Sequence, residues 1–379
     1  MIDNKKVMSS VKRTIVERLK VFRRFYYVYR EWKILQQDRK QLWKEAVERF
    51  NNEQPEHGSL LDYKHALFRH RVSYDEYMKY FEFWRLNEKR REEYISAKEI
   101  RCIYRKTVQL SFDILCQDKA LLYTKFHNYV YRKWAYSGLS VDVLKNMVAS
   151  TDCVGKPVHG SLGLGVFLIR KDENHNWQEL YDFCCQKNIL VEECVRACKE
   201  MEEFHPQSLN TLRVYTISKD GHCEILAAEF RVGVGDSIVD NASAGGIVAA
   251  IDLDTGTIIG DGEDKVGNKY PVHPNSGKAF KGFVIPYWNN VVTVCKELST
   301  VVPEIVFAGW DICVLQNGEI EMVEVNSYPH VTGLQIAYHK GLKPEFRTLG
   351  KKVLGYDPVK LISVWSKCYV KYESIYGRC

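Results

Sequence analysis

Three polar residues near the end of the chain, Asp311, Glu324 and Asn326, have the chemistry of a divalent-cation site. Asp311 lies in one apolar segment, and the other two lie in the next, which alternates apolar and polar residues as strands do. Asn317-Gly318 between the segments is typical of a tight hairpin. Such a hairpin would bring Asp311 back towards the other two residues, which are two positions apart and so share one face of a strand. Their oxygen atoms suit Mg²⁺, which also keeps positions for water and phosphate oxygens.

A glycine-rich segment earlier in the chain has the composition of a phosphate-binding loop. Glycines let backbone N–H groups close on phosphate oxygens, and a lysine before them adds a positive charge. The segment lacks the Lys-Ser/Thr pair that ends a Walker loop. A hairpin with glycines at its turn is the alternative. The residues concerned are Lys156, His159, Gly160, Ser161, Gly163 and Gly165.

A third segment is an apolar run that ends in two acids, and it is typical of a hinge beside a nucleotide. Its backbone N–H and C=O groups could pair with an adenine ring, with a carboxylate nearby. Two solvated acids at the end of a strand are the alternative. The residues concerned are Glu192, Glu193, Cys194 and Val195.

These segments belong to a glycine-rich and β-rich part of the chain that begins near residue 150. Alternation and β-branched residues predict strands at 165–170, 189–195, 212–218, 224–232, 246–253, 306–315 and 320–325. Helical spacing predicts helices at 289–299, 345–353 and 358–372, and two helical regions nearer the N-terminus, the second over 74–98. The sequence predicts an α+β fold with a helical region at 1–115, a part with the phosphate loop at 116–195 and a core part at 196–379.

The length of 379 residues predicts two or three subdomains. No apolar run reaches the about 18 residues that cross a bilayer, and the first residues lack the apolar segment of a secretory signal. The 12 cysteines are scattered without a Cys-x-x-Cys pair. These features predict a cytoplasmic protein with reduced thiols.

The first 50 residues are strongly basic, with 14 Lys and Arg against 6 Asp and Glu. Apolar residues at steps of three or four predict an amphipathic helix at 11–30 with basic neighbours. This helix could bind anionic lipid head groups, or it could dock on the body of the protein with a solvated basic face. No recognition motif for nucleic acid accompanies the charge, so nucleic-acid binding is disfavoured.

The order of these segments resembles the ATP-grasp superfamily: a lysine and a glycine loop, an acidic hinge, then Asp followed by Glu-x-Asn. The spacing from Asp311 to Glu324 and Asn326 is similar to that of the D-alanine:D-alanine ligases. A closer resemblance, over about residues 115–355, is to the sugar-transfer-associated ATP-grasp subgroup. The features of that subgroup have similar segments in this chain, at residues 209–216, 239–246, 272–274 and 309–311.

The resemblance implies that two α+β subdomains grip ATP between them. Lys156 would contact the α- and β-phosphates, and the loop at 160–165 would close over the β- and γ-phosphates. Residues 192–195 would hold the adenine ring. Lys119 would be the second phosphate lysine, with Lys125 as its competitor.

Two further residues could contact the nucleotide, and the resemblance also assigns ligands to the metal. Asn210 could reach the ribose, and His159, inside the glycine-rich segment, could touch the γ-phosphate. The cation ligands Asp311, Glu324 and Asn326 would hold Mg²⁺, with Glu324 bridging two ions.

One position departs from the D-alanine ligase pattern. Those ligases carry an arginine two residues before the first Mg²⁺ aspartate, where this chain has Gly309. Arg213 and Arg231, each on a predicted strand, are the candidates to replace it and to stabilise the oxyanion of the reaction. A surface ion pair is the alternative for each of them.

A further group of residues could contact the substrate. Acidic and amide side chains next to glycines also form plain turns, and a histidine before proline is often structural, so these alternatives stay open. The residues concerned are Asp240, Asn241, Gly245, Gly246 and His273.

The resemblance implies an ATP- and Mg²⁺-dependent carboxylate–amine ligase that acts through an acyl phosphate. The subgroup implies a sugar-linked carboxylate, such as a uronic acid, coupled to an amino acid or amine in surface-polysaccharide or capsule assembly. An acceptor on a lipid carrier would bring residues 11–30 to the inner face of the membrane. A kinase that passes the γ-phosphate to a sugar-type acceptor is one alternative, and a non-catalytic nucleotide-binding scaffold is the other.

Overall fold

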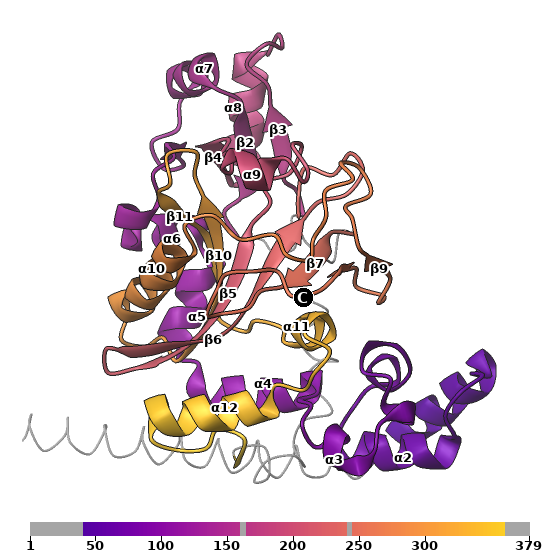
Figure 1. Cartoon of the computed structure of the whole chain (residues 1–379). Coiled ribbons are helices and arrows are strands. Elements are labelled where there is room, and N and C mark those ends of the chain that lie inside the picture. The colour runs from indigo at the N-terminus through magenta and orange to yellow at the C-terminus, as the bar shows by residue number, and fades with distance from the viewer. Residues whose placement is uncertain (1–40, 160–163, 241–244, 361–379) are drawn as a thin grey trace, which may run out of the picture.

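The computed structural model describes residues 41–159, 164–240 and 245–360 (Figure 1). The basic helix predicted at 11–30 lies outside these residues, as do Gly160, Ser161, Gly163, Asn241 and residues 361–372 of the last predicted helix. The described chain begins in a helix that runs to residue 53. None of the helices in these ranges has both the length and the apolar character that a bilayer crossing requires.

A seven-stranded antiparallel sheet forms the centre of the protein, in the order β11-β10-β5-β6-β7-β8-β9. Its strands are β5 (Leu212–Lys219), β6 (His222–Val232), β7 (Ile247–Ala250), β8 (Gly262–Glu263), β9 (Lys269–Tyr270), β10 (Phe307–Val314) and β11 (Ile320–Asn326). The sequence predicts the five longer strands, and the structure confirms them, with β7 shorter than predicted. The two-residue strands β8 and β9 are too short to show an alternating pattern.

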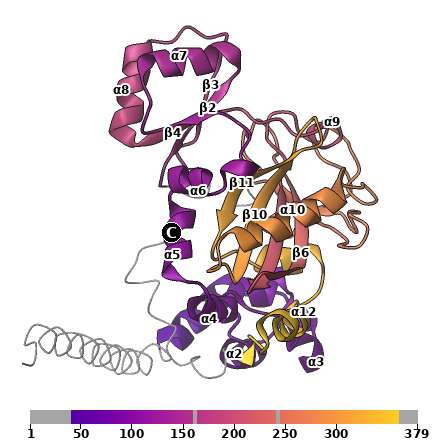
Figure 2. The same cartoon turned by 90° about the vertical axis from the view of Figure 1, so that its left-hand side faces the viewer.

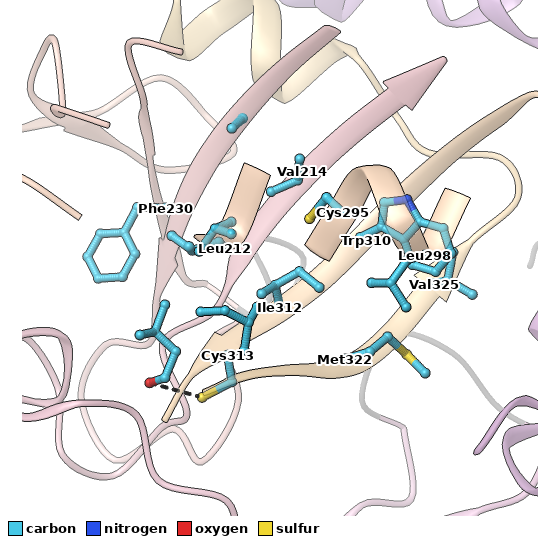
Figure 3. Close-up of a cluster of buried hydrophobic side chains, with 14 of the residues drawn as sticks. Leu212, Val214, Phe230, Cys295, Leu298, Trp310, Ile312, Cys313, Met322 and Val325 are labelled. Atoms are coloured by element: carbon cyan, nitrogen blue, oxygen red, sulfur yellow. Dashed lines mark hydrogen bonds between the residues drawn. The ribbon is translucent and has the colours of Figure 1, made fainter. Parts of the chain in front are cut away.

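One face of this sheet holds the main hydrophobic core and is covered by helix α10 (Trp288–Val301), close to the predicted 289–299 (Figures 1 and 3). Trp310 is completely buried there. Its indole N–H donates to the hydroxyl oxygens of Thr216 and Ser299, each at 3.0 Å. Because side chains alternate along β10, the neighbours of Trp310 point to the opposite face of the sheet.

A smaller antiparallel sheet, in the order β1-β4-β2-β3, lies above the large sheet in Figure 1. Its strands are β1 (Trp134–Ala135), β2 (Cys153–Pro157), β3 (Phe167–Ile169) and β4 (Ile189–Glu193), and helices α7 (Val141–Ser150) and α8 (Trp177–Lys187) pack against it. The strands predicted at 165–170 and 189–195 are confirmed as β3 and β4. Since β2 and β3 pair directly, the glycine-rich segment connects two strands of one hairpin.

The short helices α6 (Lys119–Lys125) and α9 (Lys199–Glu202) lie at the end of the large sheet that faces the small sheet, and α5 (Leu110–Gln117) lies beside the large sheet (Figures 1 and 2). A further short helix, η3 (His127–Tyr129), follows α6. The two sheets lie within the predicted parts 116–195 and 196–379, and the boundaries of the three parts stay predictions.

Helices from both ends of the described chain pack below the large sheet (Figures 1 and 2). They are α2 (Leu60–Arg69), η1 (Glu76–Tyr80), η2 (Phe83–Arg85), α3 (Glu88–Arg91), α4 (Ala97–Thr107), α11 (Thr332–Ala337), α12 (Lys343–Leu349) and η5 (Gly350–Leu354). The prediction of a helix at 345–353 is confirmed by α12 and η5. The predicted helical region over 74–98 is helical in several short elements, but it is not continuous. Glu82 is left-handed (φ 47°), and caps at Asn87 and Ser96 begin new helices, so the segment divides into short turns.

The N-terminal helices are joined to the core by a fully buried glutamine. Gln335 in α11 accepts a hydrogen bond from the Ile95 N–H at 2.9 Å and donates to the Ile95 carbonyl at 2.8 Å. Its Oε1 also accepts from the Leu342 N–H at 3.1 Å. One side chain therefore satisfies backbone groups from two segments that are far apart in the sequence.

Candidate nucleotide and metal site

A cavity of about 530 Å³ lies between the two sheets and takes its lining from both. The small sheet and the start of α6 contribute basic groups, and β10 and β11 contribute carboxylates. The predicted site residues that line it are Lys119, Lys156, Glu192, Glu193, Cys194, Val195, Asp240, Asp311 and Glu324. The fold thus brings together most of the chemistry that the sequence places in separate segments.

The hairpin of β10 and β11 positions the predicted cation ligands. Gly318 in its turn has a φ of +83°, which suits glycine. Asp311 pairs with Glu324, and Gly309 pairs with Asn326. Directly paired residues in antiparallel strands project to one face, so the three ligands share the face of the sheet away from α10. This register confirms the hairpin and the shared face that the sequence predicts.

Two arginines hold the Asp311 carboxylate. Arg213 on β5 donates from Nε to Oδ1 and from Nη2 to Oδ2, the latter at 2.8 Å. Arg231 on β6 donates from Nη1 to Oδ1 at 2.8 Å. Burial by itself would raise the pKa of Asp311, but the two guanidinium charges outweigh it and hold the pKa below its ordinary value. The structure therefore brings both predicted arginines to the predicted metal aspartate.

Glu324 has the opposite electrostatic environment. Burial and the neighbouring charge of Asp311 raise its pKa, and the Lys119 ammonium opposes this rise. No hydrogen bond or ion pair to the described residues engages its carboxylate. A buried carboxylate of this kind is stabilised strongly by a bound cation, because the cation compensates for lost solvation.

The donor set at this place fits Mg²⁺. Asp311 and Glu324 supply carboxylate oxygens, and Asn326 supplies an amide oxygen, which are the ligands that this ion takes. The amide Nδ2 of Asn326 is buried without a hydrogen-bond partner in the described part of the chain. Arg213 and Arg231 already bind Asp311 and therefore compete with a cation for its carboxylate. Glu324 is thus the ligand best placed to hold the ion.

On the small sheet, Lys156 and Glu192 form a buried ion pair. Glu192 also accepts a hydrogen bond from the Tyr123 hydroxyl at 2.9 Å and lies 3.1 Å from Nε of Arg132. Burial would raise the pKa of Glu192, but Arg132 and Lys156 outweigh it and lower the pKa to about 2. Burial would lower the pKa of Lys156, and Glu192 outweighs that, so the pKa is raised and the lysine stays charged.

The predicted adenine hinge continues from this ion pair along the cavity. Glu193 accepts a hydrogen bond from the Lys133 N–H at 2.9 Å, and the Cys194 N–H donates to the Asp152 carbonyl at 2.9 Å. Cys194 and Val195 line the cavity where β4 ends. Their contact with an adenine ring stays a prediction.

The two candidates for the second phosphate lysine are separated by the structure. Lys119, the first residue of α6, lines the cavity, and burial lowers its pKa, with Lys156 adding to this effect and Glu324 opposing it. Lys125 is exposed at the other end of α6 and does not line the cavity. This placement favours Lys119.

Asn210 and His273 are not brought to the cavity, and both need correction. Asn210 is completely buried, and its Nδ2 donates to the carbonyls of Met201 and His205 at 3.0 and 2.9 Å. His273 is also completely buried, with its Nε2 2.8 Å from the Gly233 carbonyl. These side chains shape turns, so they are in no position to contact a ribose or a substrate.

His159 and the glycines at 245 and 246 also lie off the cavity lining. His159 is 67% exposed, and its Nδ1 lies 3.1 Å from the Gln117 carbonyl. Gly245 is exposed with a φ of +96°, Gly246 is buried, and Gly165 has a φ of +74° beside Pro157. No described contact connects these residues to the charged groups of the cavity.

Asp240 is the one predicted substrate residue in the described ranges that reaches the cavity. Its Oδ2 accepts hydrogen bonds from both the N–H (2.8 Å) and the hydroxyl of Thr211. Its Oδ1 lies 3.6 Å from Nη2 of Arg231. Asp240 therefore orients Arg231, which Asp311 holds from the other side.

Residues 86–351 match the family described as sugar-transfer associated ATP-grasp. The chain belongs to this family. This membership confirms the predicted family and the ATP-grasp fold. None of the curated proteins compared with this ATP-grasp chain matches it.

Solved structures similar to this ATP-grasp chain include the ATP-grasp ligase PsnB complexed with minimal precursor, Mg and ADP (TM-score 0.41, 12% identity, 67% of this chain and 62% of that chain). The ADP complex of PurK, N5-carboxyaminoimidazole ribonucleotide synthetase, is similar at TM-score 0.38 and 12% identity over 60% of this chain and 52% of that chain. The D-alanine-D-alanine ligase from Coxiella burnetii is similar at TM-score 0.37 and 8% identity over 69% and 59%. The chain thus spans only 52–62% of the length of these three proteins.

Proposed function

We propose that this ATP-grasp protein is an ATP- and Mg²⁺-dependent carboxylate–amine ligase. One observation carries the proposal: a lysine from α6, a lysine from the small sheet and two carboxylates from the large sheet line a single cavity. Lys119 and Lys156 are placed to neutralise a triphosphate. Asp311 and Glu324 supply the oxygen ligands for the metal that a nucleotide brings. The adenine ring would lie along residues 192–195, with the phosphates directed towards β10 and β11.

The reaction proceeds in two displacements. The substrate carboxylate attacks the γ-phosphorus, and the bond between the γ-phosphorus and the β-phosphate oxygen breaks. ADP departs, and the substrate becomes an acyl phosphate. An amine then attacks the acyl carbon, loses a proton and displaces phosphate, which gives an amide. Asp311, Glu324 and Asn326 would hold Mg²⁺, which would supply positive charge to neutralise the phosphate oxygens. Lys119 and Lys156 hold the phosphates in line with the attacking carboxylate.

The second displacement needs cationic groups beside the tetrahedral oxyanion. Arg213 and Arg231 lie next to the proposed metal ligands, held there by Asp311 and Asp240. A guanidinium carries five N–H donors in a fixed fork, which suits it to bind an oxyanion. This arrangement supports their assignment as the replacement for the arginine that other ligases carry at the position of Gly309.

For the substrates we propose a sugar carboxylate, such as a uronic acid, and an amino acid or other amine. The association of the family with sugar transfer supports this choice. The protein would then act in the cytoplasm in the assembly of a surface polysaccharide or capsule, and residues 11–30 would contact the inner face of the membrane if the acceptor is carried on a lipid.

The test is an incubation with ATP, Mg²⁺, a uronic acid or its nucleotide-sugar form, and a pool of amino acids. We expect equal amounts of ADP and phosphate and a new amide mass in the mass spectrum. ADP with a phosphorylated sugar and no free phosphate would identify a kinase instead, the alternative raised by the lack of an arginine at position 309. Glu324→Gln should abolish turnover while circular dichroism shows an intact fold, and full turnover in this variant would contradict the proposed metal site.

A further inference from the structure

One buried arginine, which no sequence motif indicates, links the two sheets beside the cavity. The side chain of Arg132, just before β1, is 2% exposed. Its Nε lies 3.1 Å from Oε2 of Glu192 on the small sheet, an ion pair without hydrogen-bond geometry. Its Nη1 pairs with Glu321 on β11 of the large sheet. Nη1 and Nη2 also donate to the carbonyls of Met322 and Val323, at 3.2 and 3.3 Å.

These contacts join the proposed phosphate lysine to the proposed metal strand. Lys156 pairs with one oxygen of Glu192, and Arg132 faces the other oxygen. Tyr123 supports both partners, because its hydroxyl donates to Glu192 and its ring centroid lies 4.5 Å from the Arg132 guanidinium carbon. The two carbonyls that Arg132 binds come directly before Glu324 in β11. A continuous chain of polar contacts therefore runs from Lys156 to the backbone that carries Glu324.

We propose that Arg132 is a positioning residue for nucleotide binding; the proposal rests on the proposed function, in which Lys156 contacts phosphates. Without Arg132, Lys156 would be the one cation in ion-pair contact with the buried Glu192 in the described part of the chain. Moving it to a phosphate would then leave a buried carboxylate unpaired, which is strongly unfavourable. With Arg132 present, Glu192 keeps a cationic partner, so Lys156 can be shared with the nucleotide.

The same guanidinium aligns the metal strand. Its planar fork reaches two carboxylates and two carbonyls at once, which a lysine ammonium cannot do. A lysine at this position would contact either Glu192 on the small sheet or the β11 groups of the large sheet, but not both. Arg132→Lys should therefore retain only part of the nucleotide affinity, and Arg132→Met should lose more.

The experiment measures the dissociation constant of Mg²⁺–ADP by titration calorimetry, together with urea unfolding. We expect Arg132→Met to raise the constant about 10- to 100-fold, as other outer-shell substitutions do. Glu321 would lose its cationic partner in this variant and keep the backbone N–H of residue 132, so Arg132→Met/Glu321→Gln serves as the repaired form. We expect the double variant to recover stability but not nucleotide affinity.

The matched control is Arg91→Met. Arg91 is also buried, and its two terminal nitrogens bind Asp62 at 2.7 Å each, in the N-terminal helices away from the cavity. Its Nε and Nη2 also donate to the Phe83 carbonyl, at 3.0 and 2.6 Å. It should lose stability and keep the wild-type affinity for Mg²⁺–ADP. Equal affinities in Arg132→Met and Arg91→Met, or wild-type affinity in the double variant, would overturn the proposal. Wild-type protein that binds no nucleotide would instead overturn the proposed function, and this proposal with it.

Discussion

Replacing Gly309 by alanine should destabilise the protein, although it adds a single methyl group. A Cβ at this position would lie 2.6 Å from Cβ of Pro329 and 3.2 Å from Cδ of Arg213. The proline ring cannot rotate away, since its own backbone fixes it and its carbonyl accepts a hydrogen bond from the Tyr104 hydroxyl at 2.9 Å. Arg213 is fixed as well, because its guanidinium is bound to Asp311. Both neighbours must therefore shift to admit the methyl group.

The cost follows from the closeness of these contacts. Overpacking of a well-packed site costs about 1–3 kcal/mol. Gly309 has no left-handed φ, so the backbone tolerates alanine, and the lower entropy of the unfolded chain returns about 0.4–1 kcal/mol. We expect a net loss of about 1–2 kcal/mol in the free energy of unfolding. Gly309→Arg, which restores the residue of the D-alanine ligases, should cost more.

Urea unfolding followed by tryptophan fluorescence measures this loss. Gly260→Ala is the control, because a Cβ there meets no atom within 4 Å and its φ is not left-handed. The control should remain within about 0.5 kcal/mol of the wild type, as most surface substitutions do. Equal free energies of unfolding for Gly309→Ala and Gly260→Ala would refute the argument that Arg213 and Pro329 occupy the space at position 309.

Three further predictions concern buried polar groups. Glu192→Gln should lower the free energy of unfolding by about 3–5 kcal/mol at pH 7. Because the pKa of Glu192 in the folded protein is about 2, below the ordinary 4.5, the difference from wild type should shrink as the pH falls from about 4.5 towards 2. A constant difference in urea titrations between about pH 6 and 3 would contradict this prediction. Gln335→Leu should leave the backbone N–H and C=O of Ile95 unpaired, which should destabilise the folded protein by about 1–3 kcal/mol for each group. Limited proteolysis should then cleave the N-terminal helices faster, and an unchanged cleavage rate would argue against a stabilising role for this contact. Trp310→Phe should lower the free energy of unfolding by about 1–3 kcal/mol, because the hydroxyl of Ser299 loses an indole donor in the buried core. Thermal unfolding measures this loss, and a melting temperature equal to that of the wild type would exclude a role for this hydrogen bond.

The parts of the site that local patterns predict are those whose partners lie close in the sequence. Asp311, Glu324 and Asn326 belong to one hairpin, so the alternation of β11 and the turn at Gly318 suffice to place them on one face. Arg132 is different. Its partner Glu321 is 189 residues away, and nothing near it in the sequence distinguishes it from the other basic residues of its segment. Burial between two sheets is a tertiary property that local spacing does not encode.

The corrections have a similar cause. Asn210 and His273 have the residue types of ligands, and Asn210 lies between two residues that line the cavity, Leu209 and Thr211. Asn210 has a left-handed φ of 52° and uses its amide to close a turn, a role that the same side chain fulfils in many loops. In the segment 74–98, aromatic and charged residues recur at helical intervals, but the left-handed Glu82 divides the segment. Sequence patterns indicate residue chemistry more reliably than they indicate which way a turn directs it.

The motif Gly309-Trp310-Asp311 can be explained by the neighbours of each residue. Alternation along β10 directs Trp310 to the core under α10 and the other two towards the opposite face. Asp311 is paired with Arg213 in the register of β10 and β5, so the arginine reaches the carboxylate from the adjacent strand. Its Cδ then passes over Gly309, where any side chain would collide with it. A glycine at 309 is therefore required for the arginine on β5 to reach Asp311. An arginine at 309 and one at 213 exclude each other in this fold, because they would occupy the same space.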